Sequence, residues 1–264
     1  MTENLFTSLS RYGVDAPGFV ASTSALGAAC TLAAAARPFR GRAAVAGLGA
    51  GLLVQAGVYL HTTLHGKFRL WERELDALGL RGDERALDLG CGRGMVLIGT
   101  ARRLPRGRAV GVDLWASKDQ SGNTPAATLA NAVAAGVRDR VEVHTADITG
   151  LPFPDADFDL VTSALVLHNI PTMPARLRAV DEALRVLRPG GRLLVADISS
   201  MVRRYAAHLG AGTVRDLGPA YWYGGPWLPV SMLELRKDAW NEDAWNEDAS
   251  NKNASDKNAS HKGF

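Results

Sequence analysis

The chain has 264 residues, of which 47% are hydrophobic and 22% are charged. These fractions are typical of a globular protein, and they exclude a chain that is disordered over most of its length. A net charge of +3 comes from 30 Lys and Arg residues against 27 Asp and Glu residues. The charge is small and no basic stripe with interleaved aromatic residues accompanies it, so we do not expect nucleic-acid binding.

The N-terminal part contains two long stretches without charged residues, 18–36 and 43–60, joined by an arginine-rich turn. Each is close to the roughly 20 residues that a helix needs to cross a bilayer. We therefore expect residues 1–66 to form an apolar helical hairpin in the membrane. Gly47 and Gly51 have the small-residue spacing that lets two such helices approach closely.

Other structures are compatible with this composition. Both stretches are rich in Ala, Gly, Ser and Thr, so the helices could instead be buried against the rest of the protein or lie in the membrane interface. A signal peptide fits poorly, because Glu3 and Asp15 oppose Arg11 and no basic cluster precedes the first stretch. Arginines on both sides of the hairpin leave its orientation undecided by the positive-inside rule.

The rest of the chain has the pattern of an α/β domain. Residues 67–80 place apolar side chains at helical spacing and predict an amphipathic helix, in which Trp71 should pack on the sheet. From residue 85 strand-like and helix-like segments alternate, as in a doubly wound parallel sheet. We expect this domain to occupy 67–237, and we expect the polar tail 238–264 to be disordered because it lacks periodic apolar residues.

Three alternating glycines interrupt the first strand–helix unit, Arg85 to Met95. Such a turn can adopt positive φ and lets a ligand lie against main-chain N–H groups, as in nucleotide-binding turns. In a dinucleotide site the third glycine would come one residue after Gly94. Asp88 would also lie near phosphates, which is unfavourable, whereas a carboxylate suits a cationic or amino-bearing ligand.

The second predicted strand, 109–113, ends in Asp113, which lies 19 residues beyond Gly94. An acidic residue at this distance from a glycine turn accepts hydrogen bonds from the two hydroxyls of a ribose. The loop Leu114 to Asn123 that follows is long and polar. It could be a flap over a ligand or a solvated surface loop, and Trp115 and Asn123 are the residues we single out in it.

The string Asp88-Leu-Gly-Cys-Gly-Arg-Gly94 resembles the first motif of the class I S-adenosylmethionine-dependent methyltransferases, an acidic residue followed by Gly-x-Gly-x-Gly. Asp113, Ala146-Asp147-Ile148 and the Leu-x-Pro-Gly-Gly-x-Leu-Leu-Val pattern from Leu187 resemble the family in the same order. The resemblance covers about residues 85–236. It implies a methyltransferase with S-adenosylmethionine as cofactor. It also implies a Rossmann-like, mostly parallel seven-stranded sheet with an antiparallel last strand.

The resemblance also implies a set of cofactor-binding residues. Asp113 would accept from the ribose, and Asp147 would accept from the adenine amino group. Ser163 and Ala164 should touch the cofactor because ligands of open α/β sheets bind at the carboxyl ends of the strands. The full expected set is Asp88, Gly90, Cys91, Gly92, Gly94, Asp113, Leu114, Asp147, Ile148, Ser163 and Ala164.

His168 follows the fourth predicted strand and should face the methyl-transfer centre. Imidazole titrates close to neutral pH, so His168 is our candidate general base for an acceptor hydroxyl. It could instead only hydrogen-bond the backbone or stack on the cofactor. Similarly, the aromatic turn Tyr221 to Trp227 could form the wall of an apolar acceptor pocket or pack on the sheet edge.

We expect the acceptor to be small and either apolar or resident in the membrane, with the methylated atom left open. A membrane-tethered module that binds the cofactor without catalysis is the alternative. Because the methyl donor is cytosolic, the catalytic domain should lie in the cytoplasm. We expect it to be attached to the membrane through residues 18–36 and 43–60, and a soluble cytoplasmic protein is the alternative.

No metal is expected. Asp155, Asp157 and Asp159 alternate in one turn but lack the glycine and distal glutamate of a calcium loop. Cys30 and Cys91 have no metal-ligand spacing and do not suggest a disulfide framework, which favours a reducing compartment.

Overall fold

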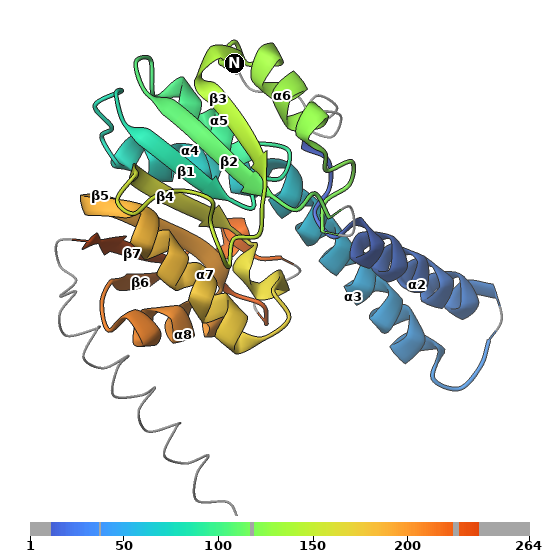
Figure 1. The fold of residues 1–264 in the computed structure, drawn as a ribbon. Helices are drawn as coiled ribbons and strands as arrows, with labels where there is room; N and C mark the ends of the chain where they lie inside the picture. The colour runs from blue at the N-terminus through green and yellow to red at the C-terminus, as the bar shows by residue number, and fades with distance from the viewer. Residues whose placement is uncertain (1–11, 37, 117–118, 224–226, 238–264) are drawn as a thin grey trace, which may run out of the picture.

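The computed structural model describes residues 12–36, 38–116, 119–223 and 227–237. A central seven-stranded sheet carries helices on both faces, and two long helices project from this body (Figure 1). The polar tail expected over 238–264 lies outside the described residues.

The sheet confirms the predicted α/β architecture. Its strand order is β3-β2-β1-β4-β5-β7-β6, and β7 runs antiparallel to both of its neighbours while the other pairs are parallel. The order reverses between β1 and β4, and ligands of such sheets bind outside the carboxyl ends at this point. The strands are β1 (Arg85–Leu89), β2 (Arg108–Asp113), β3 (Val141–Thr145), β4 (Phe158–Ala164), β5 (Leu187–Ile198), β6 (Thr213–Asp216) and β7 (Val230–Arg236).

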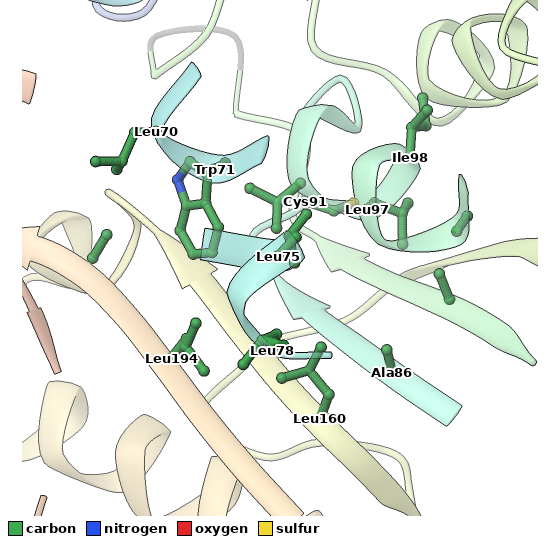
Figure 2. Packing of buried hydrophobic residues seen from close by; sticks show 14 of the residues in the cluster. Leu70, Trp71, Leu75, Leu78, Ala86, Cys91, Leu97, Ile98, Leu160 and Leu194 are labelled. Atoms are coloured by element: carbon green, nitrogen blue, oxygen red, sulfur yellow. The ribbon is translucent and has the colours of Figure 1, made fainter. Parts of the chain in front are cut away.

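Two apolar clusters fill the space between the sheet and its helices. One lies under α4 and α5, and the other lies under α7 and α8. Figure 2 shows the first, in which Trp71 and Leu75 of α4 and Leu97 of α5 lie over the sheet. Trp71 is 2% exposed, which confirms that it packs on the sheet. The helices of the domain are α4 (Lys67–Ala77), α5 (Met95–Arg102), α6 (Pro125–Ala134), α7 (Met173–Val186) and α8 (Ser199–Leu209).

The projecting pair is formed by α2 (Pro17–Ala36) and α3 (Arg42–His61). The structure places no break at the domain boundary expected between residues 66 and 67. Instead, α3 continues through a π-helical turn, Thr62–Gly66, directly into α4. Such π-helical turns insert an extra residue into a helix and occur frequently at functional sites. The hairpin is therefore joined to the domain by a continuous helix.

The helices of the hairpin meet at Gly27 and Gly49. A Cβ atom on Gly49 would lie 2.5 Å from Thr31 Oγ1 and 2.8 Å from the Gly27 carbonyl oxygen. The prediction that Gly47 and Gly51 make the close approach is wrong, because no atom lies within 4 Å of a Cβ built on either. They flank Gly49 on the exposed side of α3, whereas Gly49 faces α2.

The outer surface of the hairpin is apolar. Two helical segments, Pro17–Ala36 and Arg42–Ala77, are long and apolar enough to cross a membrane by length and composition, and their most apolar windows of 18 residues have mean hydropathies of 1.6 and 1.7. Only 22% and 17% of the residues in their most apolar windows are buried. The alternative of helices buried against the domain is therefore not what the structure shows. The large apolar side chains exposed on the pair are Phe19, Leu26, Leu32, Leu48, Leu53 and Val54.

Candidate active site

A cavity of about 610 Å³ opens at the carboxyl ends of β1, β2 and β4. This volume lies within the range of small-molecule sites. The cavity brings together most of the residues that the sequence predicts for the cofactor, but Gly94 and Ser163 lie behind its surface. The predicted residues that line it are Asp88, Gly90, Cys91, Gly92, Asp113, Leu114, Asp147, Ile148 and Ala164, together with His168.

The glycine turn shapes the wall of this cavity. Gly90, Gly92 and Gly94 all have positive φ, at +66°, +52° and +88°. Their N–H groups already have acceptors within the protein: Val112 O for Gly90, Asp113 Oδ2 for Gly92 and Cys91 O for Gly94. The sequence suggests that these three N–H groups bind the ligand, but in the structure they bond to the protein itself. The glycines instead leave room for a ligand because they carry no side chains.

The loop after β2 holds the Asp113 carboxylate in place. Its Oδ2 accepts from Gly92 N at 2.8 Å, and its Oδ1 accepts from Trp115 N at 2.5 Å and from Asn123 Nδ2 at 3.1 Å. Trp115 Nε1 in turn donates to Thr145 Oγ1 at 2.7 Å. The two loop residues singled out from the sequence thus fix Asp113 at the cavity wall, where it can accept hydrogen bonds from a ligand.

Asp88 is a buried carboxyl group beside the turn. It is 4% exposed, and its Oδ1 accepts a hydrogen bond of 2.8 Å from Thr162 Oγ1. Burial raises the pKa of Asp88 to about 7, and the nearby Asp113 carboxylate adds to the rise, while the Thr162 hydroxyl opposes it. A cation in the cavity would therefore favour ionisation of this group.

Asp147 lies at the rim, beyond the end of β3. One of its oxygens, Oδ1, accepts from the backbone N and the hydroxyl of Thr149, both at 2.8 Å. The carboxylate is therefore oriented locally, and the neighbouring Ile148 is buried against the second apolar cluster. These two residues offer one polar and one apolar contact to a ligand at this end of the cavity.

His168 is held by a buried carboxylate that was not predicted from the sequence. Its Nδ1 lies 2.6 Å from Asp197 Oδ1, and its backbone N donates to Asp197 Oδ2 at 3.0 Å. Asp197 is the penultimate residue of β5 and is fully buried. Because an ionised carboxylate only accepts, Nδ1 carries the proton of the neutral ring and Nε2 carries the lone pair. The only sequence signal was an acidic residue at a strand end.

A cluster at the root of the hairpin also lines the cavity, and its residues were not predicted from the sequence. The carboxylate of Asp15 accepts from Lys67 Nζ at 2.8 and 2.9 Å, from Thr63 Oγ1 at 2.8 Å, and from Tyr223 OH at 3.1 Å. Gln120 Nε2 donates to Asp15 at 3.2 Å, while Gln120 Oε1 accepts from Arg93 N in the glycine turn at 2.8 Å. The residues before α2 are thus connected to the glycine turn.

Each of the three aspartates in the turn before β4 pairs with an arginine. Asp155 lies 2.7 Å from Arg185, Asp157 lies 3.2 Å from Arg85, and Asp159 lies 2.8 Å from Arg188. Their role here is structural. Across the residues that the structure describes, no group of three or more His, Cys, Asp or Glu side chains could hold a metal ion.

Comparison with known proteins identifies this domain. Residues 87–195 match a family of methyltransferase domains. The chain contains a class I S-adenosylmethionine-dependent methyltransferase domain. Its cofactor is S-adenosylmethionine, and the cavity has the volume of a small-molecule site and is lined by carboxylates that suit a cationic ligand.

Two relatives illustrate the similarity of the methyltransferase domain. The chain is 35% identical over 152 residues to 27-O-demethylrifamycin SV methyltransferase of Amycolatopsis mediterranei (strain S699), which covers 57% of this chain and 52% of that protein. It is 36% identical over 137 residues to the ubiquinone/menaquinone biosynthesis C-methyltransferase UbiE of Roseobacter denitrificans, covering 52% and 51%. The chain thus spans about half the length of the curated relatives it matches.

Solved structures share the fold of the methyltransferase domain. Geranyl diphosphate C-methyltransferase from Streptomyces coelicolor A3(2) superposes with a TM-score of 0.51 at 17% identity, covering 66% of this chain and 82% of that one. The [4+2]-cyclase SpnF superposes with a TM-score of 0.50 at 21% identity, covering 62% and 80%. Since one of these proteins is a cyclase, the fold alone does not fix the reaction.

Proposed function

We propose that this protein transfers a methyl group from S-adenosylmethionine to a hydroxyl group of a small apolar acceptor that resides in the membrane. The observation that carries the reaction type is the hydrogen bond between His168 Nδ1 and the buried Asp197. When bound, S-adenosylmethionine supplies an electrophilic methyl group on a sulfonium. A base is required only where the acceptor must lose a proton. His168 at the cavity wall can act as that base.

In this proposal each group has one task. His168 Nε2 takes the proton of the acceptor hydroxyl, whose oxygen becomes the nucleophile, and Asp197 stabilises the imidazolium that forms. Asp113 accepts from the ribose hydroxyls and Asp147 from the adenine amino group. Asp88 offers its negative charge to the cationic end of the cofactor. The wall of the cavity positions the two reactants and excludes water.

The relatives support an acceptor of this general class. Their names concern 27-O-demethylrifamycin SV and ubiquinone/menaquinone biosynthesis, so both an O- and a C-methylation occur among them. The His168–Asp197 pair favours oxygen in this chain. The alternative, a module that binds the cofactor without catalysis, assigns no task to a histidine oriented in this way.

Turnover tests the proposal. The full chain in lipid nanodiscs is supplied with S-adenosylmethionine and a cell lipid extract, and release of S-adenosylhomocysteine is measured. We expect release with the wild-type protein, and a decrease of about 100-fold in His168→Gln with cofactor affinity retained. Normal cofactor binding without release from any lipid fraction would contradict the proposal and leave the non-catalytic alternative.

We further propose that α2 and α3 anchor the protein in the membrane, with the catalytic domain in the cytoplasm. Each helix has 20 residues, which is about 30 Å of helix and matches the hydrocarbon core of a bilayer. The hairpin projects away from the domain (Figure 1), and its large apolar side chains are exposed. A bilayer would cover this surface.

Liposome flotation tests the anchor. We expect the wild-type chain to float with liposomes and a Leu26→Lys/Val54→Lys variant to lose flotation, because a lysine near the bilayer centre costs about 3 kcal/mol. Leu26 and Val54 are 55% and 66% exposed on the hairpin. Val133→Lys is the matched control, since Val133 is 63% exposed on α6. A wild-type chain that stays soluble without detergent would contradict the proposal.

A further inference from the structure

Part of the cavity wall comes from residues outside the matched segment 87–195. Tyr59 belongs to the last turns of α3, Lys67 begins α4, and Tyr221 and Tyr223 follow β6, while Asp15 precedes α2. These side chains come from three distant parts of the sequence. They meet where the hairpin joins the domain, so this end of the cavity is built from parts of the chain outside the matched segment.

Aromatic rings form one side of this region. The rings of Tyr59 and Tyr223 are 5.1 Å apart at an interplanar angle of 80°, and those of Tyr221 and Tyr223 are 5.6 Å apart at 83°. Tyr59 also contacts Phe19 of α2 with a centroid separation of 5.2 Å, and Phe19 is 42% exposed. The rings thus connect the apolar surface of the hairpin to the cavity, and edge-to-face packing suits a further aromatic ring.

An ion pair between the buried Lys67 and the partly buried Asp15 supplies the polar part. Lys67 is 3% exposed, and within the described part of the chain its ammonium donates to both oxygens of Asp15. An ammonium has three N–H groups, so a donor remains for an oxygen atom in the cavity. Burial raises the pKa of Asp15, but Lys67, with the hydroxyls of Thr63 and Tyr223, holds that pKa below its usual range. The Asp15 carboxylate is therefore ionised at neutral pH.

We infer that this region is the acceptor subsite and that it binds a flat aromatic molecule through its ring and one oxygen. The tyrosine rings contact the ring, and Lys67 donates to the oxygen. Asp15 balances the charge of Lys67, so the subsite is neutral overall and favours an uncharged, oxygen-bearing ligand over an anion. This inference rests on the proposed function, because it assigns the acceptor of the same cavity.

Binding of a fluorinated probe tests the inference without turnover. The full chain in lipid nanodiscs is loaded with S-adenosylhomocysteine, and ¹⁹F line broadening is measured for 4-fluoro-1-naphthol and for the oxygen-free 1-fluoronaphthalene. Empty nanodiscs give the partition baseline. In an Asp15→Asn/Lys67→Met variant, which removes both charges together, we expect affinity for the naphthol to fall roughly tenfold, the value of a hydrogen bond to a charged group. Affinity for 1-fluoronaphthalene should not change.

Two further variants complete the test. Arg69→Met removes an exposed cation two residues from Lys67 and should leave both affinities unchanged. Tyr59→Leu removes one ring and should lower the affinity for both probes. If the double variant no longer binds S-adenosylhomocysteine, the Tyr59→Leu variant alone tests the inference. Broadening equal to that of empty nanodiscs, or wild-type affinity in both subsite variants, would overturn the inference. If the chain binds the naphthol but shows no methyl transfer, the subsite stands and the proposed function fails.

Discussion

The Asp88 carboxyl is the buried group whose ionisation the cofactor should change. Its pKa lies at about 7 in the free protein, so a large fraction is protonated near neutral pH. A cationic ligand favours the ionised form, so binding below that pKa must release a proton and affinity must rise as the pH passes through it. A ligand that binds the neutral acid would show the opposite trend, with an affinity that falls as the pH rises.

We therefore expect the affinity for S-adenosylmethionine to increase between about pH 6 and pH 8. Calorimetry in buffers of different ionisation enthalpy measures the proton release directly. The Asp88→Asn variant should release fewer protons on binding than the wild-type protein, because it lacks the carboxyl group of Asp88. Because both proteins share the titration of the ligand's own amino group, their difference isolates Asp88. Equal proton release from the two proteins would contradict this assignment.

The role proposed for Asp197 is to position His168. In Asp197→Asn the amide can donate to Nδ1, which would move the ring proton to Nε2 and remove the base from the cavity. We expect kcat to fall by about 100-fold with little change in the acceptor KM. The measurement is S-adenosylhomocysteine release with the lipid fraction that supports turnover.

The chain offers a matched control for this variant. His208 Nε2 lies 2.7 Å from Asp181 Oδ1, in a second histidine–aspartate pair between α8 and α7 that does not line the cavity. Asp181→Asn makes the same chemical change outside the site and should leave kcat unchanged. A similar loss in both variants would indicate a general effect on folding rather than a positioned base.

At the scale of elements, the α2–α3 pair depends on one close approach. Gly49→Ala would place a methyl group against Thr31 and the Gly27 backbone, and such overpacking costs about 1–3 kcal/mol. Gly47→Ala meets no atom within 4 Å and should instead stabilise the helix by about 1 kcal/mol, because alanine is the better helix former. Thermal unfolding of the two variants in the same detergent measures the difference. Equal midpoints would show that the helices do not pack as described.

Local patterns were sufficient to predict most elements and part of the site. The alternation of strands and helices, the glycine turn and the strand end at Asp113 depend on residues close together in sequence. Asp197, Gln120 and Asp15 could not be predicted, because each acquires its role from a partner that only the fold brings near. The close approach in the hairpin was assigned to the wrong glycines, since spacing indicates a small-residue face but not which face meets the partner helix.

In the whole molecule, the hairpin and the cavity are connected by side chains at the root of the hairpin. Asp15 precedes α2, Lys67 follows the π-helical turn, and Gln120 links Asp15 to the glycine turn. Asp15 is the last charged residue before the first apolar stretch, and Lys67 is the first after the second. The ends of the proposed anchor are therefore part of the cavity wall, so changes at the membrane surface are expected to reach the cofactor site.

The glycine turn is the part of the chain to which we assign the cofactor site. Gly92 has a φ of +52°, and a Cβ atom there would lie 2.5 Å from Gln120 Oε1, so an arginine side chain at this position would strain the turn and enter the cavity. The most direct test is calorimetric titration of the full wild-type chain and of Gly92→Arg with S-adenosylmethionine. We expect binding by the wild-type protein and no measurable binding by the variant. Normal binding by Gly92→Arg would contradict the assignment.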